Sequence, residues 1–245
     1  MTNEFTILDN QQITATVWRM VLSGDISAFS APGQFVNIEL PDKFLRRPIS
    51  VCDINFAKSA ITLIYKVVGA GTLQMSQMQK GEKLDLLTGL GNGFDIDIET
   101  KSPLIIGGGV GCPPLYYLAK CLIDKNLQPK IVLGFNSKEE IFLKNEFEQL
   151  GLQVFLATID GSYGTKGFVT DTLSENNLSF DYYFACGPMP MLKAIHNTLK
   201  ISGQLSFEER MGCGFGGCMG CTCKTKNGYK RICTDTILKS EEVIF

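Results

Sequence analysis

Arg210-Met-Gly-Cys-Gly-Phe-Gly-Gly-Cys-Met-Gly-Cys-Thr-Cys-Lys224 is the most distinctive stretch of this 245-residue sequence. Cys213, Cys218 and Cys221 are separated by four and two residues, and Cys233 follows after eleven more. This is the plant-type order in which four thiolates hold a [2Fe–2S] cluster. The glycines between the cysteines supply the positive φ angles and close backbone approach that a loop around a compact inorganic core needs. The stretch therefore predicts a metal centre near the C-terminus.

Other uses of these cysteines stay open on spacing alone. A structural zinc site is expected to show paired Cys-x2-Cys knuckles, which the four-residue gap fits poorly. A disulfide framework needs an oxidising compartment, and Met1–Phe5 does not begin a secretory signal. A Rieske centre needs two histidine ligands, and His196 is the single histidine. An all-cysteine one-electron carrier is favoured, with zinc as the main alternative.

The composition excludes several classes of protein. With 44% hydrophobic and 20% charged residues, the chain has ample material for a packed core. A formal net charge of −2 leaves no basic stripe to neutralise nucleic-acid phosphates. The apolar runs fall short of the roughly 20 residues of a membrane span. We expect a cytoplasmic protein that binds neither nucleic acid nor membrane.

The first 100 residues predict a small antiparallel β-barrel, because short β runs alternate with turn residues from Thr6 to about Leu90. The expected strands include Ile13–Leu22, Gln34–Leu40, Pro48–Ile54 and Ala60–Val68. One short helix is expected over Thr72–Gln79, with Thr72 as its cap.

Strand and helix alternate beyond residue 100, which predicts a doubly wound α/β domain with a parallel sheet over residues 101–203. The expected strands are Leu104–Ile106, Ile131–Phe135, Val154–Thr158 and Tyr182–Cys186. The expected helices span residues 114–124, 138–150, 167–174 and 189–201. A last strand over Gln204–Arg210 leads into a cluster-binding region, residues 204–245, whose terminal Val243–Phe245 we expect to fray.

Two glycine-containing turns follow strands of this expected sheet. Gly107–Gly111 reads Gly-Gly-Gly-Val-Gly and precedes a helix, where a pyrophosphate can approach the backbone. Cys186-Gly-Pro-Met189 also opens a helix beside the expected crevice. A tight structural turn and a buried cysteine are the competing explanations.

The barrel half carries three weaker motifs. In Arg46-Arg-Pro-Ile-Ser50, an arginine can hold a pyrophosphate bidentately and the serine can donate a hydrogen bond. Taken singly, each of these three motifs has an equally good structural explanation. Surface charge explains the arginine motif, a strand surface explains the Tyr65–Lys66 pair, and a helix cap explains the Gly71–Thr72 pair.

The order of these motifs along the chain resembles the ferredoxin reductase family of flavoproteins over essentially its whole length. The cysteine spacing narrows the resemblance to electron-transfer subunits of NAD-dependent (type B) dihydroorotate dehydrogenases. The resemblance implies one FAD and one [2Fe–2S] cluster per chain, with NAD as a diffusible acceptor. The implied FAD contacts are Arg47, Pro48, Ile49, Ser50, Ile64, Tyr65, Lys66, Gly71 and Thr72. The implied NAD contacts are Gly107, Gly108, Gly109, Gly111, Cys186, Gly187 and Pro188. The implied cluster ligands are Cys213, Cys218, Cys221 and Cys233, while Cys223 receives no ligand role.

This chain departs from the family pattern in the strand that carries the implied FAD contacts Arg47 to Ser50. The family motif has an aromatic residue where this chain has Pro48 or Ile49. The resemblance therefore does not imply an aromatic stack on the flavin from that strand.

The resemblance also implies a partner and a route for electrons. An FMN-containing dihydroorotate dehydrogenase subunit, in a heterotetramer of two of each chain, would pass electrons through the cluster and FAD to NAD⁺ in pyrimidine (UMP) biosynthesis. No side chain of this chain is expected to act as acid or base. The acidic pair Glu139–Glu140, after the second α/β strand, slightly favours binding of NAD over binding of NADP. The alternatives are a stand-alone NAD(P)H reductase of a ferredoxin, sulfide dehydrogenase or oxygenase type, and a zinc-stapled nucleotide-binding regulator.

Overall fold

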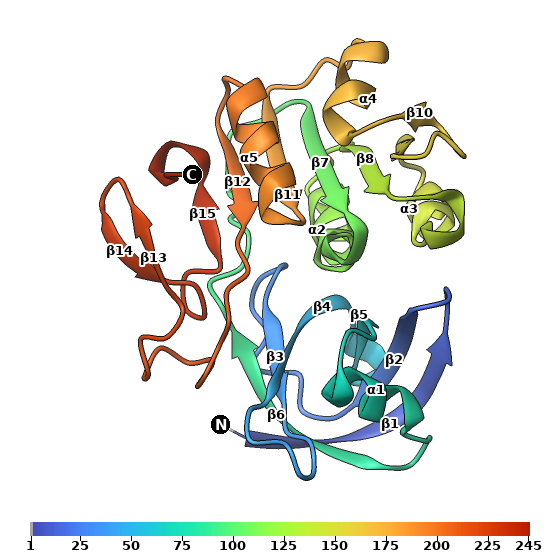
Figure 1. Cartoon of the computed structure of the whole chain (residues 1–245), viewed down its shortest axis with the longest axis vertical. Helices are drawn as coiled ribbons and strands as arrows, with labels where there is room; N and C mark the ends of the chain where they lie inside the picture. Colours follow the sequence, from blue (N-terminus) through green and yellow to red (C-terminus); the bar gives the residue numbers. More distant parts are fainter. Residues whose placement is uncertain (1) are drawn as a thin grey trace.

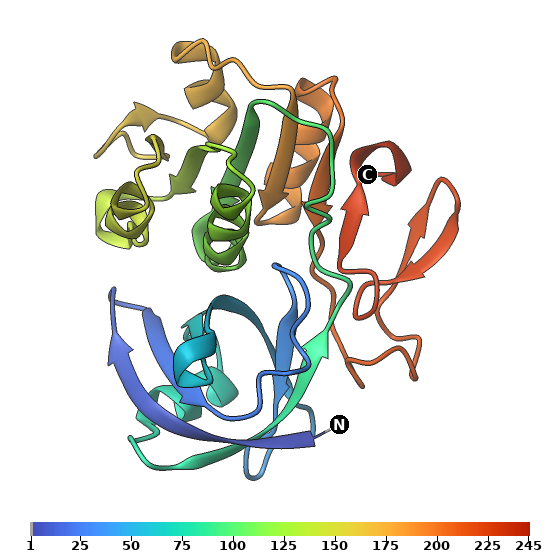
Figure 2. The ribbon, with the colours of Figure 1, turned by 180° about the vertical axis from the view of Figure 1, so that it is seen from behind.

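The computed structural model describes residues 2–245, and Figure 1 shows three parts of unequal size. A barrel forms one end, a sheet covered by helices forms the other, and a small C-terminal region lies beside both. The green segment in Figure 2 links barrel to sheet between Leu90 and Pro103, so the boundary predicted at about residue 100 lies within this linker.

The N-terminal part is a closed antiparallel barrel of six strands in the order β1-β2-β5-β4-β3-β6. Its strands are β1 (Thr2–Gln12), β2 (Val17–Ser23), β3 (Phe35–Ile38), β4 (Arg47–Asn55), β5 (Ala60–Lys66) and β6 (Lys83–Leu90). Alternate apolar side chains fill the interior, among them Phe5, Val36 and Leu86. The predicted barrel is confirmed, although residues 13–16 are a turn and not part of a strand.

The one helix of the barrel, α1 (Ala70–Gln77), begins two residues earlier than predicted. Gly69 is the N-cap, so the prediction of Thr72 as the cap is wrong. Thr72 instead sits in the first turn, where its hydroxyl oxygen accepts from the backbone N–H groups of Val68 and Gly69. The result for the helix end is the same, because free backbone donors gain an acceptor.

The α/β part is a seven-stranded sheet in the order β10-β9-β8-β7-β11-β12-β15, and the predicted parallel arrangement is confirmed for all but the last strand. Its parallel strands are β7 (Pro103–Gly108), β8 (Lys130–Phe135), β9 (Val154–Thr158), β10 (Thr165–Lys166), β11 (Tyr182–Cys186) and β12 (Gly203–Ser206). The antiparallel edge strand is β15 (Ile237–Lys239). Helices α2 (Pro113–Asp124) and α3 (Lys144–Gln149) contribute to one core, and α4 (Val169–Glu175) and α5 (Met189–Thr198) to the other, so both faces are covered (Figure 1).

The helix predicted over residues 138–150 is wrong in its first half. Only a 3-10 turn over Lys138–Glu140 forms before the chain straightens. Phe142 and Leu143 are then buried in the core, and Leu143 adopts a left-handed φ of 65° before α3 begins. Burying two large apolar side chains outweighs continuing the helix.

The C-terminal region is more ordered than the sequence suggested. After β12 comes the cysteine loop, then a hairpin of β13 (Thr222–Thr225) and β14 (Gly228–Arg231) that was not predicted. The strand expected over Gln204–Arg210 stops at Ser206. The expected frayed end is also wrong, because Val243 is buried and the Phe245 ring stacks on Phe207.

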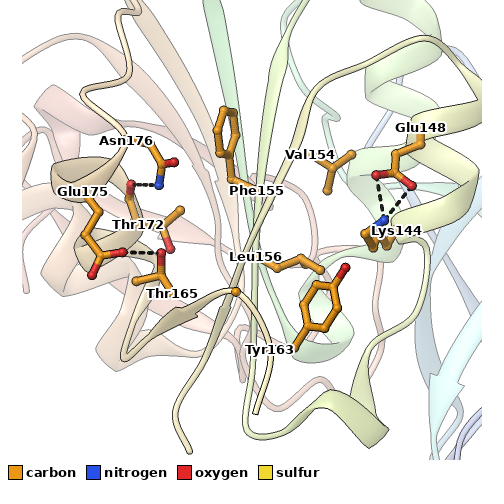
Figure 3. A pocket seen from close by; sticks show the side chains of 11 residues that line it. Lys144, Glu148, Val154, Phe155, Leu156, Tyr163, Thr165, Thr172, Glu175 and Asn176 are labelled. Carbon is orange, nitrogen blue, oxygen red and sulfur yellow. Dashed lines mark hydrogen bonds and ion pairs between the residues drawn. The ribbon is translucent and has the colours of Figure 1, made fainter. Parts of the chain in front are cut away.

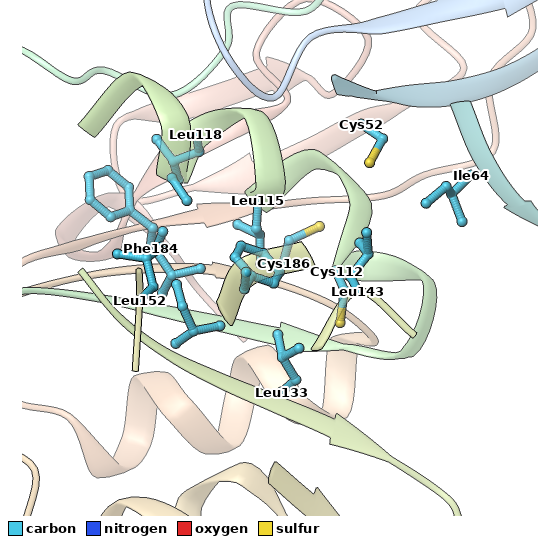
Figure 4. Packing of buried hydrophobic residues seen from close by; sticks show 14 of the residues in the cluster. Cys52, Ile64, Cys112, Leu115, Leu118, Leu133, Leu143, Leu152, Phe184 and Cys186 are labelled. Atoms are coloured by element: carbon cyan, nitrogen blue, oxygen red, sulfur yellow. The ribbon is translucent and has the colours of Figure 1, made fainter. Parts of the chain in front are cut away.

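The barrel packs directly against the α/β part through α2. Cys52 and Ile64 of the barrel belong to the same buried cluster as Leu115 and Leu118 of α2, and Figure 4 shows them across this interface. Lys120 of α2 pairs with Asp53 of β4 at 2.6 Å. The barrel keeps a core of its own, but a few of its residues join the core of the α/β part, which fixes the barrel surface relative to the sheet.

Candidate functional site

The glycine-rich turn after β7 is shaped by contact with the loop after β11. Gly109–Gly111 form a 3-10 turn, and α2 begins at Pro113. A Cβ atom on Gly111 would lie 2.5 Å from the Cys186 carbonyl oxygen, closer than any real contact allows. A Cβ on Gly187 would lie 3.2 Å from the Gly108 Cα. The two predicted nucleotide motifs thus lie backbone against backbone, as neighbouring strand ends of a parallel sheet should.

These two loops form one side of a cleft with a volume of about 610 Å³. Lys66 of the barrel, Asn136 and Glu140 after β8, and Glu208 after β12 also line it. The size suits a nucleotide, and the cleft lies at the carboxyl ends of the parallel strands, where α/β sheets bind ligands. The structure thus brings Lys66 together with Gly108, Gly109, Gly111, Gly187 and Pro188.

Cys186 is buried at the base of these loops, and Figure 4 shows it beside Leu115. Burial, with a smaller contribution from Glu208, raises the pKa of its thiol to about 12. A neutral thiol is a small apolar contact and not a nucleophile. Glu208 itself borders the cleft, where the surrounding protein raises the pKa of its carboxyl. Sequence reasoning missed Glu208, because nothing in its local pattern places it at the cleft.

The barrel places an arginine side chain at the N-terminus of α1. The Arg47 side chain crosses this end, so that a Cβ on Gly71 would lie 2.2 Å from the Arg47 Nε. Arg46, in contrast, is paired with Glu39 and Asp85 on the barrel surface. A guanidinium beside free helix N–H groups suits a diphosphate, and no carboxylate in the described residues is paired with Arg47.

The remaining predicted FAD residues divide by the direction of their side chains. Pro48 is exposed, and Ile49 and Ser50 are half-buried, along the same stretch of β4. Tyr65 lies inside the barrel, where its hydroxyl donates to Asn10, so only its backbone is available to a cofactor. Ile64 faces the shared core with α2.

The cysteine loop points backbone N–H groups at its own sulfurs. Gly217 and Cys218 donate to the Cys213 Sγ at 3.1 and 3.3 Å, and Cys213 donates back to the Cys218 Sγ at 3.4 Å. Such donors stabilise thiolates and tune the potential of a bound cluster.

A second pair of sulfurs lies on the buried side of the loop. Cys233 donates its N–H to the Cys221 Sγ at 3.3 Å. Gly216 donates to the Cys233 Sγ at 3.1 Å and ties this pair to the loop that carries the first. The four predicted ligands are therefore arranged as two linked pairs, which fits two irons with two protein thiolates each.

The ionisation of the thiols agrees with a metal site. Burial opposes ionisation of Cys213, but N–H groups of Cys218 and Phe215 outweigh it and lower its pKa to about 6. Burial and the neighbouring Cys221 raise the pKa of Cys233 to about 12, so this thiol is protonated at neutral pH unless a bound cation displaces the proton. Within residues 2–245, no three Cys, His, Asp or Glu side chains lie close enough together to hold a metal ion. The four-residue gap between Cys213 and Cys218 matches the plant-type [2Fe–2S] order and fits paired zinc knuckles poorly.

Two family models match the chain in these regions. Residues 208–235 match the iron–sulfur cluster binding domain of dihydroorotate dehydrogenase B. Residues 105–197 match the oxidoreductase NAD-binding domain. The first covers all four predicted ligands and the second covers both glycine turns.

Relatives of nearly the same length show the family. A dihydroorotate dehydrogenase B (NAD(+)) electron transfer subunit of Fusobacterium nucleatum is 45% identical over 94% of this chain and 93% of its own. That of Bacillus pumilus is 43% identical over 97% and 96%. The chain belongs to this family of electron transfer subunits. The predicted resemblance is confirmed.

Solved structures agree with the fold. A structure described as an NADH-dependent reduced ferredoxin–NADP oxidoreductase covers 98% of this chain at 30% identity, with a TM-score of 0.88. This chain covers 89% of that one. Phthalate dioxygenase reductase shares the fold at 19% identity and a TM-score of 0.65, over 79% of this chain and 63% of that one. The first match covers nearly the whole chain, and the second covers about four fifths of it.

A second hollow, of about 470 Å³, lies at the outer edge of the sheet. Figure 3 shows two pairs of polar side chains in its wall: Lys144 pairs with Glu148 at 2.7 Å, and Thr165 donates to Glu175 at 2.7 Å. It adds nothing to the cleft. Across the described part of the chain, no helix is long and apolar enough to cross a membrane.

Proposed function

We propose that this chain is the electron-transfer subunit of an NAD-dependent dihydroorotate dehydrogenase, which carries electrons from a catalytic partner to NAD⁺ for pyrimidine (UMP) biosynthesis. The observation that carries the proposal is one chain holding both a nucleotide cleft and a paired-cysteine loop. Bound FAD and [2Fe–2S] supply two-electron and one-electron chemistry, which a route ending in hydride transfer to nicotinamide requires.

The protein's own residues bind and orient these groups. Arg47 and the N-terminus of α1 hold the FAD diphosphate. The segments Pro48–Ser50 and residues 64–66 contact the flavin. Gly107–Gly111 and Cys186–Pro188 shape the NAD site, and burial of Cys186 excludes water there. Cys213, Cys218, Cys221 and Cys233 ligate the cluster. No side chain needs to move a proton on dihydroorotate.

The catalytic partner docks over the exposed side of the cysteine loop. Cys218 is exposed, and the neighbouring Phe215 and Met219 side chains are 61% and 59% exposed. Large apolar side chains beside a cluster ligand suit a partner surface, since electrons must leave over a short distance. We place an FMN-containing dihydroorotate dehydrogenase subunit here, in a cytoplasmic heterotetramer of two of each chain.

Glu140 supports NAD over NADP. It lines the cleft after β8 and accepts from the Asn136 amide at 2.7 Å. A fixed carboxylate can accept from a ribose hydroxyl and repels a 2′-phosphate. Replacing Glu140 with Gln should therefore narrow the preference for NADH over NADPH by about tenfold, the effect of about 1.4 kcal/mol.

The test is orotate formation by the chain together with its partner. The gene beside this one is expected to encode the FMN subunit, and the co-purified pair should reduce NAD⁺ with dihydroorotate. The chain alone should oxidise NADH when a one-electron dye accepts the electrons, but leave dihydroorotate untouched. A chain that purifies alone and reduces a soluble ferredoxin, with no effect on any dihydroorotate dehydrogenase, would instead be a stand-alone reductase.

A further inference from the structure

Asn37, on β3 of the barrel, is buried between the flavin strand and the cysteine loop. Its side chain is 1% exposed. Its backbone pairs with Pro48 of β4 in the barrel ladder. Its side-chain Nδ2 faces the carbonyl oxygen of the ligand Cys213 at 3.4 Å. One residue thus contacts both the strand assigned to FAD and the loop assigned to the cluster, although Asn37 and Cys213 are 176 positions apart in sequence.

The cysteine loop is shaped to receive this side chain. Gly214, next to the ligand Cys213, is buried with a left-handed φ of 82°. A Cβ on Gly214 would lie 2.5 Å from the Asn37 Nδ2, so no other residue fits there without displacing Asn37. The contact is therefore close on both sides, and a change at either side moves Cys213 relative to the barrel.

Asn37 is not an ordinary structural bridge, as Asn92 shows. Asn92 also joins the barrel side to the C-terminal region, but both ends of its amide are used. Its Nδ2 donates to the Ile237 carbonyl at 3.0 Å, and its Oδ1 accepts from the Ile237 N–H at 2.9 Å. The Asn37 Oδ1 is buried and finds no donor among residues 2–245. A leucine would fill this volume without a buried unpaired acceptor.

We propose that Asn37 is a positioning residue for electron transfer: it fixes the cluster ligand Cys213 against flavin strand β4 and so sets the coupling between cluster and FAD. This inference rests on the proposed function. Each transfer oxidises one cluster iron and reduces the flavin by one electron. Two transfers and two protons from solvent balance one hydride delivered to NAD⁺ and one proton released.

The backbone of Asn37 is itself held in place. The Arg46 guanidinium donates to the Asn37 carbonyl oxygen at 3.3 Å and to the Asp85 carbonyl at 3.1 Å, bridging neighbouring strands of the barrel. A rigid strand is the support that a distance-setting side chain needs. The Asn37 amide therefore holds the cluster loop at a fixed position relative to the barrel.

The test compares Asn37→Leu and Asn37→Asp with the matched control Asn92→Leu, all in the complete chain with both cofactors. Leu keeps the branched shape and removes the polar atoms, and Asp keeps the shape but replaces the donor with a carboxylate facing the Cys213 carbonyl. Anaerobic stopped-flow with NADH follows flavin and cluster absorbance separately. Electron paramagnetic resonance and redox titration report the cluster itself.

Both Asn37 variants should keep FAD and slow transfer between flavin and cluster about tenfold, the usual effect of removing a group that supports a metal ligand. The cluster resonance should change shape, and Asp should make the cluster potential more negative. Asn92→Leu should lower thermal stability and leave transfer rate and resonance unchanged.

Transfer within twofold of wild type in both Asn37 variants, with an unchanged resonance, would overturn the inference, as would equal slowing in Asn92→Leu. Failure of the proposed function itself would look different, because the wild-type chain would then lack the cluster or not reduce it with NADH.

Discussion

The nucleotide cleft and the cysteine loop are both rich in glycine, but the glycines serve different ends. In the cleft, Gly111 and Gly187 are needed because two backbones touch, and large buried side chains hold those backbones from behind. In the loop, N–H groups point at sulfur, and the ligand Cys218 is exposed. The cleft is thus shaped by the protein core. The loop is held largely by its own N–H···S bonds, so we expect a bound metal to stabilise its shape.

Removing a ligand should have the largest effect and should be confined to the loop. Cys218→Ala is expected to abolish the cluster and to reduce orotate-linked NADH formation to background, while FAD stays bound. Because the loop loses its metal, limited proteolysis should cut within residues 210–224 and leave the barrel and sheet intact. Visible spectra and mass spectrometry of the fragments measure this.

Cys223→Ser is the matched control for that change. Cys223 lies on β13 of the hairpin and is assigned no ligand role, so its variant should keep the cluster and the protease resistance of the loop. Orotate-linked turnover that survives in Cys218→Ala would show that the electrons take another route.

Replacing Arg47 tests whether the barrel's cofactor site is as preformed as the cleft. Arg47→Ala should weaken FAD binding by about 1.5–3 kcal/mol, the contribution of a charged hydrogen bond. Arg46→Ala should instead lower stability through its lost pairs with Glu39 and Asp85 and leave FAD affinity nearly unchanged. Fluorescence titration of the flavin-free protein gives both affinities. Equal loss of FAD in the two variants would show that the effect is a general disturbance of the barrel.

A methyl group at Gly111 tests whether the cleft is packed as tightly as described. Gly111→Ala forces the Cys186 backbone away and should cost about 1–3 kcal/mol of unfolding free energy, with a raised KM for NADH. Gly109→Ala, in the same turn, meets no atom within 4 Å and carries only a left-handed φ of 53°, so it should cost about 1 kcal/mol. Urea unfolding and NADH oxidation with a one-electron dye measure both. The close packing is disproved if Gly111→Ala is the milder change.

The smallest expected effect concerns His196 of α5. Its ring lies against the ring of Phe245 in the C-terminal tail, at a centroid distance of 5.3 Å. Burial, with Lys226 and Lys200, lowers the pKa of His196 below its unfolded value of about 6.5. The unfolded chain therefore binds the proton more readily, so this contribution to stability is present above about pH 6.5 and is lost as pH falls through the lower folded-state pKa.

His196→Gln should reduce the loss of stability between about pH 7 and about pH 5 without altering either cofactor. Urea midpoints at the two pH values check this. An undiminished pH dependence in the variant would assign it to other groups.

The sequence predicted the kinds of cofactor that the chain binds better than it predicted how distant residues are arranged around the sites. The cysteine spacing and the glycine turns are local patterns, so they could be found without a structure. Glu208 and Asn37 reach their sites through contacts between distant segments, and no periodicity marks them. The 138–150 segment failed for a related reason: its helical pattern was real, but burial of Phe142 and Leu143 in the tertiary core overrode it.

The most direct test of the central claim, that one chain joins a nicotinamide cleft to an iron–sulfur cluster, is NADH reduction of the purified chain followed by electron paramagnetic resonance. The account predicts about two irons and about two acid-labile sulfides per chain. It also predicts a [2Fe–2S] resonance that appears on adding NADH and is absent in Cys218→Ala. A colourless protein that contains about one zinc per chain, and shows no resonance after anaerobic reconstitution with iron and sulfide, would contradict it.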